Sequence, residues 1–302
     1  MNEKYNSEID CFIDYIASQK GSSPNTINAY RKDLTKFFNF LSNKTIDFDT
    51  LDRNSVRGFL TELINSGISN RSVNRLLAAL KGFIKFKTRT GYQDSAGILE
   101  LDSFKIPSYL PVFLFDNELE KLIAFECATL FDYRDRAIIE LFFSTGLRVS
   151  ELVGLTINHF SNRDFTLKVK GKGNKERIVV YNELSLKFLD EYLEVRESEQ
   201  SKKGLSNKSD ALFVNFHFMQ LSDRAVRTII NKRIEQSAVM KNISPHSLRH
   251  SFATSMLRNG ADIRTVQILL GHSKISSTQI YTHLTTDELK DMHYKYHPHG
   301  KN

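Results

Sequence analysis

Apolar side chains between residues 7 and 89 recur at every third or fourth position, which is the spacing of amphipathic helices. Capping and turn residues divide this region: residues 22–26 precede a second helix, Thr50 or Asn54 opens a third, and Ser69 or Asn70 opens a fourth. The apolar face is clearest in the second helix, at Tyr30, Leu34, Phe37, Phe38 and Leu41. The pattern predicts a small helical bundle.

A connector follows this bundle. Gly91 ends the periodic region, and Pro107 and Pro111 favour an extended chain rather than the interior of a helix or strand. We therefore expect an N-terminal helical domain over residues 1–105, a linker over residues 106–112 and a second domain over residues 113–302.

Helical spacing returns in the second domain, over residues 117–125, 134–144 and 149–155, and again from Leu184 onward. The stretch at residues 196–210 is polar enough to be a solvated loop.

One segment of the second domain has the spacing of strands. Phe165, Leu167 and Val169 alternate with other residues, as do Ile178 and Val180, around a turn at residues 171–175. This pattern predicts a β-hairpin. The predicted fold class is mainly α with a small antiparallel β-sheet.

Composition narrows the choice of partners. The 302 residues carry a net charge of +7, with a pI near 9.2, which favours a polyanionic partner.

Cys11 and Cys127 match no metal or redox spacing, and no apolar run reaches the roughly 18 residues of a membrane span. The N-terminus is polar and acidic, unlike a signal peptide. We expect a cytoplasmic protein without membrane insertion.

The sequence SPHSLRH gathers basic side chains at the start of a helix. Ser244 is a good N-cap and Pro245 fits the first helical position, so His246 and Arg249 are expected to converge on one face. Backbone N–H groups and the helix dipole favour an anion there, and a phosphate fits best. The alternative is that a histidine caps a turn and Arg249 pairs with a surface acid.

Further candidates lie far away in the sequence. Arg148 opens a helix just after a glycine break, and Glu151 three positions on can orient its guanidinium. His272 directly follows a helix-ending glycine, and Tyr281 lies further along. Tyr281 could instead be a core tyrosine, because apolar residues neighbour it.

The glycine-rich turn GKGNK contains Lys172. Other basic residues surround it, so an ordinary solvated hairpin lysine is the alternative; these are Lys168, Lys170, Lys175 and Arg177. The turn is not a P-loop, since that pattern needs a glycine where Thr166 stands.

The tail histidines match no metal-ligand spacing and are expected to be exposed; they are His293, His297 and His299.

Together these residues resemble the tyrosine recombinase (phage integrase) family, XerC/XerD type. The matching motifs are TGLRVSEL with Arg148, GKGNKER with Lys172, HSLRH with His246 and Arg249, LLGH with His272, and YTH with Tyr281. SPNTINAYRKDLTKFFNFL is similar to the family's N-terminal DNA-clamping domain, and YTHLTTDELKDMHYKYHPHG to the Xer C-terminus. The resemblance implies a two-domain, C-shaped DNA clamp with an α+β catalytic domain of the DNA breaking-rejoining type.

The resemblance also implies a role for each residue. Tyr281 is the nucleophile and forms a 3′-phosphotyrosyl ester. Arg148 and Arg249, with His272, stabilise the charge of the transition state. Lys172 protonates the 5′ leaving oxygen, and His246 acts as general acid or base. Glu151 orients Arg148, and the chemistry uses no metal and no other cofactor.

The implied partner is double-stranded DNA with a specific core site. Basic residues of the first domain could lie along its backbone, although several could simply be solvated; they are Arg31, Lys32, Lys36, Arg71, Arg75, Lys81, Lys85 and Lys87. A tail helix with Leu284, Leu289, Met292 and Tyr294 could dock on a neighbouring protomer in a homo- or hetero-tetramer, or pack on its own chain. An FtsK-type DNA translocase is a further possible partner.

The expected function is site-specific recombination, with chromosome dimer resolution as the leading role. A mobile-element integrase or invertase, a type IB topoisomerase and a catalytically silent DNA-binding protein are the alternatives.

Overall fold

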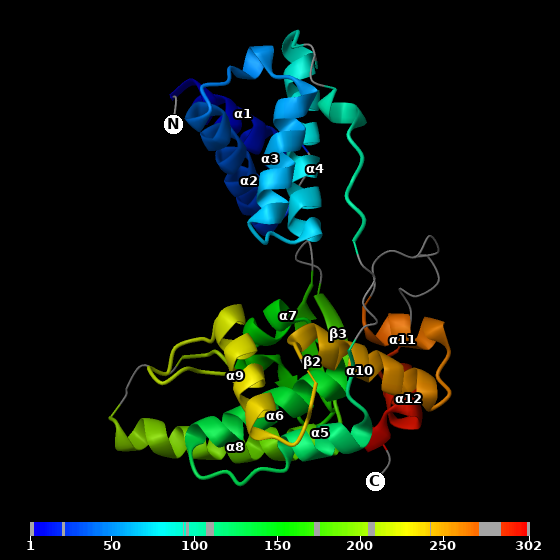
Figure 1. The fold of residues 1–302 in the computed structure, drawn as a ribbon. Coiled ribbons are helices and arrows are strands. Elements are labelled where there is room, and N and C mark those ends of the chain that lie inside the picture. Colours follow the sequence, from blue (N-terminus) through cyan, green and yellow to red (C-terminus); the bar gives the residue numbers. More distant parts are fainter. Residues whose placement is uncertain are drawn as a thin grey trace. The chain divides into compact units, whose positions relative to one another are not determined.

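The computed structural model describes residues 3–19, 22–92, 94, 97–106, 112–171, 176–204, 209–241, 243–271 and 285–300. The chain divides into two compact units, Met1–Tyr109 and Leu110–Asn302 (Figure 1). Within the described residues no helix is both long and apolar enough to cross a membrane.

The first unit is helical, as predicted. It contains α1 (Glu3–Ser18), α2 (Pro24–Asn43), α3 (Arg53–Asn65) and α4 (Asn70–Lys87), with 3-10 turns at Phe48–Thr50, Thr88–Thr90 and Ile98–Glu100. Ser23 and Ser69 cap α2 and α4 through their side chains. Asp52 caps α3, so the expectation that Thr50 or Asn54 would do so was wrong. The error is local, because any of these short polar side chains can accept the N-terminal N–H groups.

Aromatic rings form the core of this unit. Phe12, Phe37, Phe38 and Phe83 are almost fully buried, and the rings of Phe38 and Phe83 meet edge to face with centroids 5.5 Å apart. Each such side chain stabilises the fold by about 1.5–3 kcal/mol through burial. The apolar stripe of α2 therefore packs as its spacing indicates.

The segment after α4 runs back along that helix (Figure 1). Asn74 holds Phe104 in both directions, because its amide donates to the Phe104 carbonyl and accepts from the Phe104 N–H, each at 2.8 Å. Lys81 donates to the Leu101 carbonyl at 2.6 Å, and Asn70 to the Lys105 carbonyl at 2.8 Å. Residues 101–105 are thus fastened to α4.

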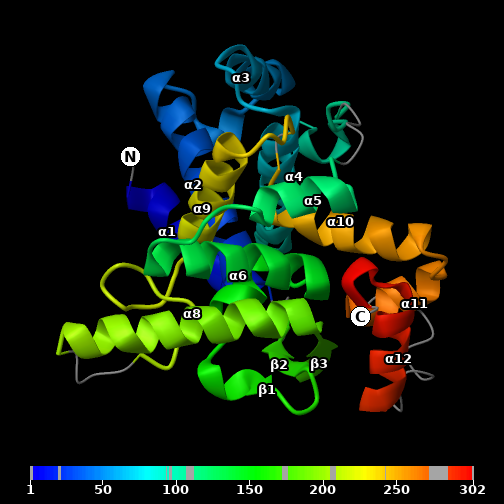
Figure 2. The ribbon, with the colours of Figure 1, turned by 90° about the horizontal axis from the view of Figure 1, so that it is seen from below.

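The second unit contains helices and one small sheet, which lies at an edge of the unit beside α8 and α12 (Figure 2). The strands β1 (Phe160–Ser161), β2 (Thr166–Lys170) and β3 (Glu176–Val180) pair antiparallel in the order β1-β2-β3. The helices are α5 (Asp116–Ile123), α6 (Leu130–Thr145), α7 (Val149–Val153), α8 (Glu183–Lys202), α9 (Asp223–Gln236), α10 (Pro245–Arg258), α11 (Ile263–Leu269) and α12 (Thr286–Tyr296), with 3-10 turns at Ile157–His159 and Pro298–Gly300. The predicted fold class, mainly α with a small antiparallel sheet, is confirmed.

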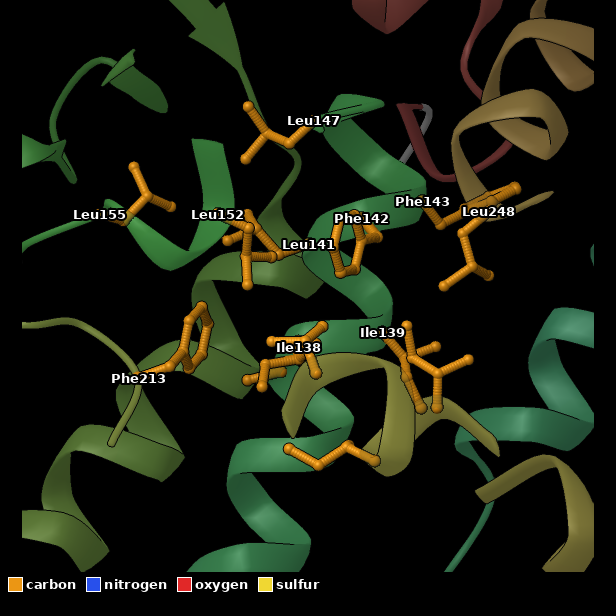
Figure 3. Packing of buried hydrophobic residues seen from close by; sticks show 14 of the residues in the cluster. Ile138, Ile139, Leu141, Phe142, Phe143, Leu147, Leu152, Leu155, Phe213 and Leu248 are labelled. Carbon is orange, nitrogen blue, oxygen red and sulfur yellow. The ribbon is translucent and has the colours of Figure 1, made fainter. Parts of the chain in front are cut away.

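Helix α6 lies at the centre of this unit. Nearly every residue of its second half is buried, and it packs against both α8 and α10. Figure 3 shows Leu152 and Leu155 on one side of α6 and Leu248 of α10 on the other. A helix that is buried on all sides lies in the core of its domain. The end of α6 is therefore rigidly placed.

The strands of the predicted hairpin form and pair antiparallel. Val179 and Val180 of β3 are buried, whereas Ile178 is exposed. In the observed register Val169 lies opposite Arg177, which brings an arginine onto the buried face. An ionic partner described below compensates for this placement.

The polar stretch at residues 196–210 is not a loop over its first part, which corrects the prediction. Helix α8 extends to Lys202, and Arg196 is buried. Its guanidinium donates to the carbonyls of Ser209, Ala211 and Leu212 at 2.7–3.0 Å. Several donors in a rigid fork satisfy backbone groups that would otherwise be unpaired.

His293 and His297 of the tail are buried and His299 is only partly exposed, contrary to the prediction that they are exposed. His293 and His297 are 1% and 2% exposed, and their Nε2 atoms lie 2.6 Å from the Ser144 carbonyl and 3.2 Å from the Phe143 carbonyl. His299 lies 3.1 Å from buried Glu140. The contacts of His293 and His297 use backbone carbonyls at the C-terminal end of α6, which lack partners inside the helix.

Helix α12 packs on its own chain. Leu289 and Met292 contact the apolar cluster shared by α10 and α11, and α12 also contacts β3 (Figure 2). The intrachain alternative is thus the arrangement in this structure. Leu284, which the docking hypothesis includes, lies outside the described residues.

Candidate active site

The first part of the site is the turn between α6 and α7. Helix α6 ends at Gly146, whose φ of 59° lies in the left-handed region. A β-carbon there would lie 2.7 Å from atoms of both Leu270 and Phe252, so only glycine fits. Two residues later Arg148 caps α7. The sequence predicted both the break and the helix start.

Glu151 holds Arg148 in the predicted way. Its carboxylate accepts from the Arg148 backbone N–H at 2.8 Å and from the Arg148 guanidinium at 2.7 Å. The Glu151 side chain is 2% exposed, whereas that of Arg148 is 38% exposed. The arginine can therefore meet a ligand while its partner stays buried.

A second arginine binds the same carboxylate. Arg177 of β3 donates to both Glu151 oxygens, at 2.6 and 3.0 Å. Burial alone would raise the pKa of Glu151, but these bonds and the one from the Arg148 backbone lower it to about 2. The Glu151 side chain is therefore ionised at neutral pH.

Arg249 approaches the same turn from α10. Its guanidinium donates to the carbonyl of Gly146 and, at 2.9 Å, to that of Leu270. Burial, and then repulsion from Arg148, lowers the pKa of Arg249 to about 10. The side chain remains charged at neutral pH and is desolvated, which strengthens its interaction with an anion. The alternative pairing with a surface acid is not what the structure shows.

His246 and Arg249 differ in environment. Ser244 caps α10 and Pro245 occupies its first turn, as predicted. His246 is exposed on that turn and Arg249 is buried three residues later. Their predicted convergence stays a prediction.

Lys172, His272 and Tyr281 lie outside the described residues. The flanking residues show where two of them are attached. Lys172 comes between β2 and β3 in the sequence, and His272 follows Gly271, whose backbone lies against Arg177. These placements support the predicted set without testing it.

Arg177 is the site residue that sequence reasoning missed. It was grouped with the lysines around Lys172 as part of a basic turn, but only 19% of its side chain is exposed. The available signal was its position two residues before Val179, because residues two apart in a strand lie on the same face. No local pattern indicates its partner, which is 26 residues away.

The described part of the site is positively charged. Arg148, Arg177 and Arg249 contribute three positive charges and Glu151 one negative charge, which leaves two positive. No group of three or more metal-ligating side chains occurs among the described residues. Guanidinium groups with this geometry bind the oxygens of a phosphate.

Half of the basic residues proposed for DNA contact in the first unit are already engaged. The pairs are Arg31 with Asp10, Arg75 with Asp33, Lys81 with the Leu101 carbonyl and Lys87 with Glu8. The exposed remainder is Lys32 and Lys36 on α2, and Arg71 and Lys85 on α4.

Comparison with known proteins gives consistent matches over both units. The Phage integrase family matches residues 113–288, and the phage integrase N-terminal SAM-like domain matches residues 9–91. The chain is 38% identical to tyrosine recombinase XerC of Oceanobacillus iheyensis over 292 residues, 96% of this chain and 95% of that protein. It is also 38% identical to tyrosine recombinase XerD of Listeria innocua over 296 residues, 97% of this chain and 99% of that protein.

A solved structure gives the same result. The XerH site-specific recombinase bound to its difH substrate, in a pre-cleavage complex, matches with a TM-score of 0.67 and 25% identity, over 91% of this chain and 82% of that one. The chain therefore belongs to the tyrosine recombinases of the phage integrase family.

Proposed function

We propose that this tyrosine recombinase cuts and rejoins DNA at a specific core site through a 3′-phosphotyrosyl intermediate, and that it resolves chromosome dimers. The observation that carries the proposal is the meeting of Arg148 and Arg249 at one turn, from positions about a hundred residues apart. The XerC and XerD relatives, which are tyrosine recombinases, and the XerH site-specific recombinase support the proposal.

The proposed reaction exchanges one phosphodiester for another. The Tyr281 oxygen attacks the scissile phosphorus, its bond to phosphorus forms, and the bond to the 5′ oxygen breaks. Lys172 supplies the proton for that oxygen, while His246 takes the proton of the phenol. The 5′ hydroxyl of another strand then attacks the phosphotyrosyl ester and restores the tyrosine.

Two arginines and a histidine act on the charge of the transition state. The Arg148 and Arg249 guanidinium groups bind the non-bridging oxygens, with His272 as a further donor, and Glu151 keeps Arg148 in place. Because the guanidiniums are held by carbonyls and a carboxylate before DNA arrives, little reorganisation accompanies the reaction.

The proposed assembly follows the resemblance. The domain over residues 1–105 and the catalytic domain over residues 113–302, joined by the linker at residues 106–112, close around the duplex as a C-shaped clamp. Four protomers, identical or of two related kinds, bring two core sites together in the cytoplasm, and an FtsK-type translocase controls them. A tail that docks on a neighbouring protomer has to leave the site on α6 that His293 and His297 occupy in this structure.

A nicked suicide substrate tests the chemistry. The duplex carries the core site and loses a short fragment on cleavage, so the phosphotyrosyl complex accumulates. The wild type should give a covalent complex that migrates slowly on a denaturing gel, with or without chelator, and Tyr281→Phe should give none. Arg148→Ala and Arg249→Ala should keep DNA binding and lose on the order of 10² in cleavage rate. Wild-type protein that never traps DNA would sink the proposal.

Plasmid assays separate the alternatives. Relaxation of supercoiled plasmids that lack any core site would indicate a topoisomerase. Covalent complex on ends of a mobile element, and none on sites of the chromosomal dimer-resolution region, would indicate an integrase or invertase.

A further inference from the structure

Arg177 occupies a position where an arginine needs a specific reason. It lies on the face of β3 that also carries buried Val179, opposite Val169 of β2. Placing a charged group on such a face is costly unless an opposite charge meets it with good geometry. Its two bonds to Glu151 provide this geometry.

The charge balance around Glu151 shows what Arg177 adds. With Arg148 alone, the carboxylate would cancel the charge of the arginine that it orients. Arg177 supplies a second positive charge to the same carboxylate, so the group of three keeps one net positive charge. Glu151 can then hold Arg148 without weakening the attraction of the site for a phosphate.

Arg177 also lies against a second part of the site. A β-carbon on Gly271 would come within 2.5 Å of the Arg177 Cδ and Nε atoms, so the backbone of Gly271 passes directly over the guanidinium stem. Gly271 has a φ of 62° and is bonded to His272. One side chain thus contacts the partner of Arg148 and the residue that carries His272.

We propose that Arg177 is a positioning residue of the recombination reaction: it fixes Glu151 and thereby Arg148, keeps the site positively charged, and packs against Gly271. This inference rests on the proposed function. The proposal differs from a purely structural ion pair, because it requires the charge and the two-bond geometry of the Arg177 guanidinium to change the rate of cleavage at the scissile phosphate.

The first experiment measures covalent-complex formation and DNA affinity for Arg177→Lys and Arg177→Gln on the nicked substrate. Arg177→Gln should lose about 10- to 100-fold in cleavage rate, with DNA affinity nearly unchanged. Losses of this size are typical when a residue that orients a ligand-binding side chain is replaced. Arg177→Lys, which keeps the charge and loses the fork, should lose less.

Arg136 offers a matched control. Its side chain is 18% exposed and donates to Glu191 at 2.6 Å, on α6 and α8. Arg136→Gln should cleave like the wild type. If Arg177→Gln cleaves within about two-fold of the wild type, or falls no further than Arg136→Gln, the inference is wrong.

A substrate with a methylphosphonate at the scissile position separates charge from structure. This group lacks one negative oxygen, so the loss of a positive charge should matter less for its cleavage. The ratio of wild-type to Arg177→Gln rates should shrink on this substrate. An unchanged ratio would overturn the electrostatic part of the proposal.

Binding of inorganic phosphate tests Arg177 without any cleavage. Thermal-shift titration should show weaker phosphate binding to Arg177→Gln than to the wild type and to Arg136→Gln. Failure of the wild type to cleave DNA would count against the proposed function alone, whereas equal phosphate affinity of all three proteins would count against Arg177.

Gly271→Ala tests the contact between Gly271 and the Arg177 side chain. Its cost in stability should be smaller when combined with Arg177→Ala than in the wild type, because the clash disappears and only the strained φ remains. Strictly additive effects would show that Arg177 does not hold Gly271 in place.

Discussion

The buried histidines of the tail make stability depend on pH. His297 accepts the His299 N–H at Nδ1, 3.1 Å away, so its proton is on Nε2 and is donated to the Phe143 carbonyl. The Nε2 of His293 lies 2.6 Å from the Ser144 carbonyl. The rings of His293 and His297 are stacked, with their centroids 4.7 Å apart. A second proton on either ring would be a buried charge beside another histidine.

The sign and size follow from the pKa values. Burial lowers the pKa of His293 to about 4, from 6.5 in the unfolded chain. Above about pH 6.5 both states are neutral; below it the unfolded chain binds the proton first, so stability falls until about pH 4. At about pH 5 the loss from His293 is roughly 2 kcal/mol, because one pKa unit corresponds to about 1.36 kcal/mol.

Neighbouring groups modify this loss. Burial, and then repulsion from His293, lowers the pKa of His297 well below its usual value, so His297 adds to the loss. Burial opposes the charge of His299 as well, but the bond to Glu140 outweighs it and raises the pKa. His299 therefore contributes stability at low pH that disappears as the pH rises through its folded pKa, and it offsets part of the effect.

The assay compares the wild type with His293→Gln, which keeps a donor and cannot titrate. Because the chain has no tryptophan and two units, pulse-labelling hydrogen exchange along a urea gradient measures α6 and α12 separately from α1–α4. Between about pH 7.5 and pH 5, the wild type should lose about 2 kcal/mol more than the variant in the second unit. Equal losses, or the same difference in α1–α4, would refute the reasoning.

Three further changes have clear expected outcomes. Gly146→Ala should cost about 2 kcal/mol or more in urea denaturation, from the left-handed φ and the clash with Leu270. Arg196→Met should cost about 3 kcal/mol in the same assay, since it leaves buried carbonyls without donors. Glu151→Gln, which leaves Arg148 and Arg177 without a counter-charge, should slow covalent-complex formation by on the order of 10² and keep DNA binding.

Local signals in the sequence were sufficient for the elements that carry the arginines. Ser244 and Pro245 start α10, and Gly146 ends α6, because caps and left-handed turns depend on a few neighbouring residues. The pair Arg148–Glu151 is also local, since three positions along a helix start bring the two side chains together.

Three of the errors share one physical cause. Arg177, Arg196 and His293 are polar residues whose partners lie far away in the sequence, so the spacing of apolar residues around them carries no information about their burial. A pattern rule assigns such residues to the surface, where unpaired charges are usual. Only the tertiary contacts show that backbone carbonyls or a carboxylate satisfy them.

The same contacts explain how the site stays ready for a phosphate. Burial, and then repulsion from Arg148, lowers the pKa of Arg249, while Arg148 and Arg177 share the carboxylate of Glu151. That repulsion is tolerated because Gly146 and Leu270 supply carbonyls to Arg249, and Glu151 binds the other two arginines. In the proposed reaction, the scissile phosphate relieves this repulsion, and the transition state, which spreads negative charge over more oxygens, relieves it further. The excess of positive charge then favours that transition state, and the buried carboxylate of Glu151 limits the repulsion between Arg148 and Arg177.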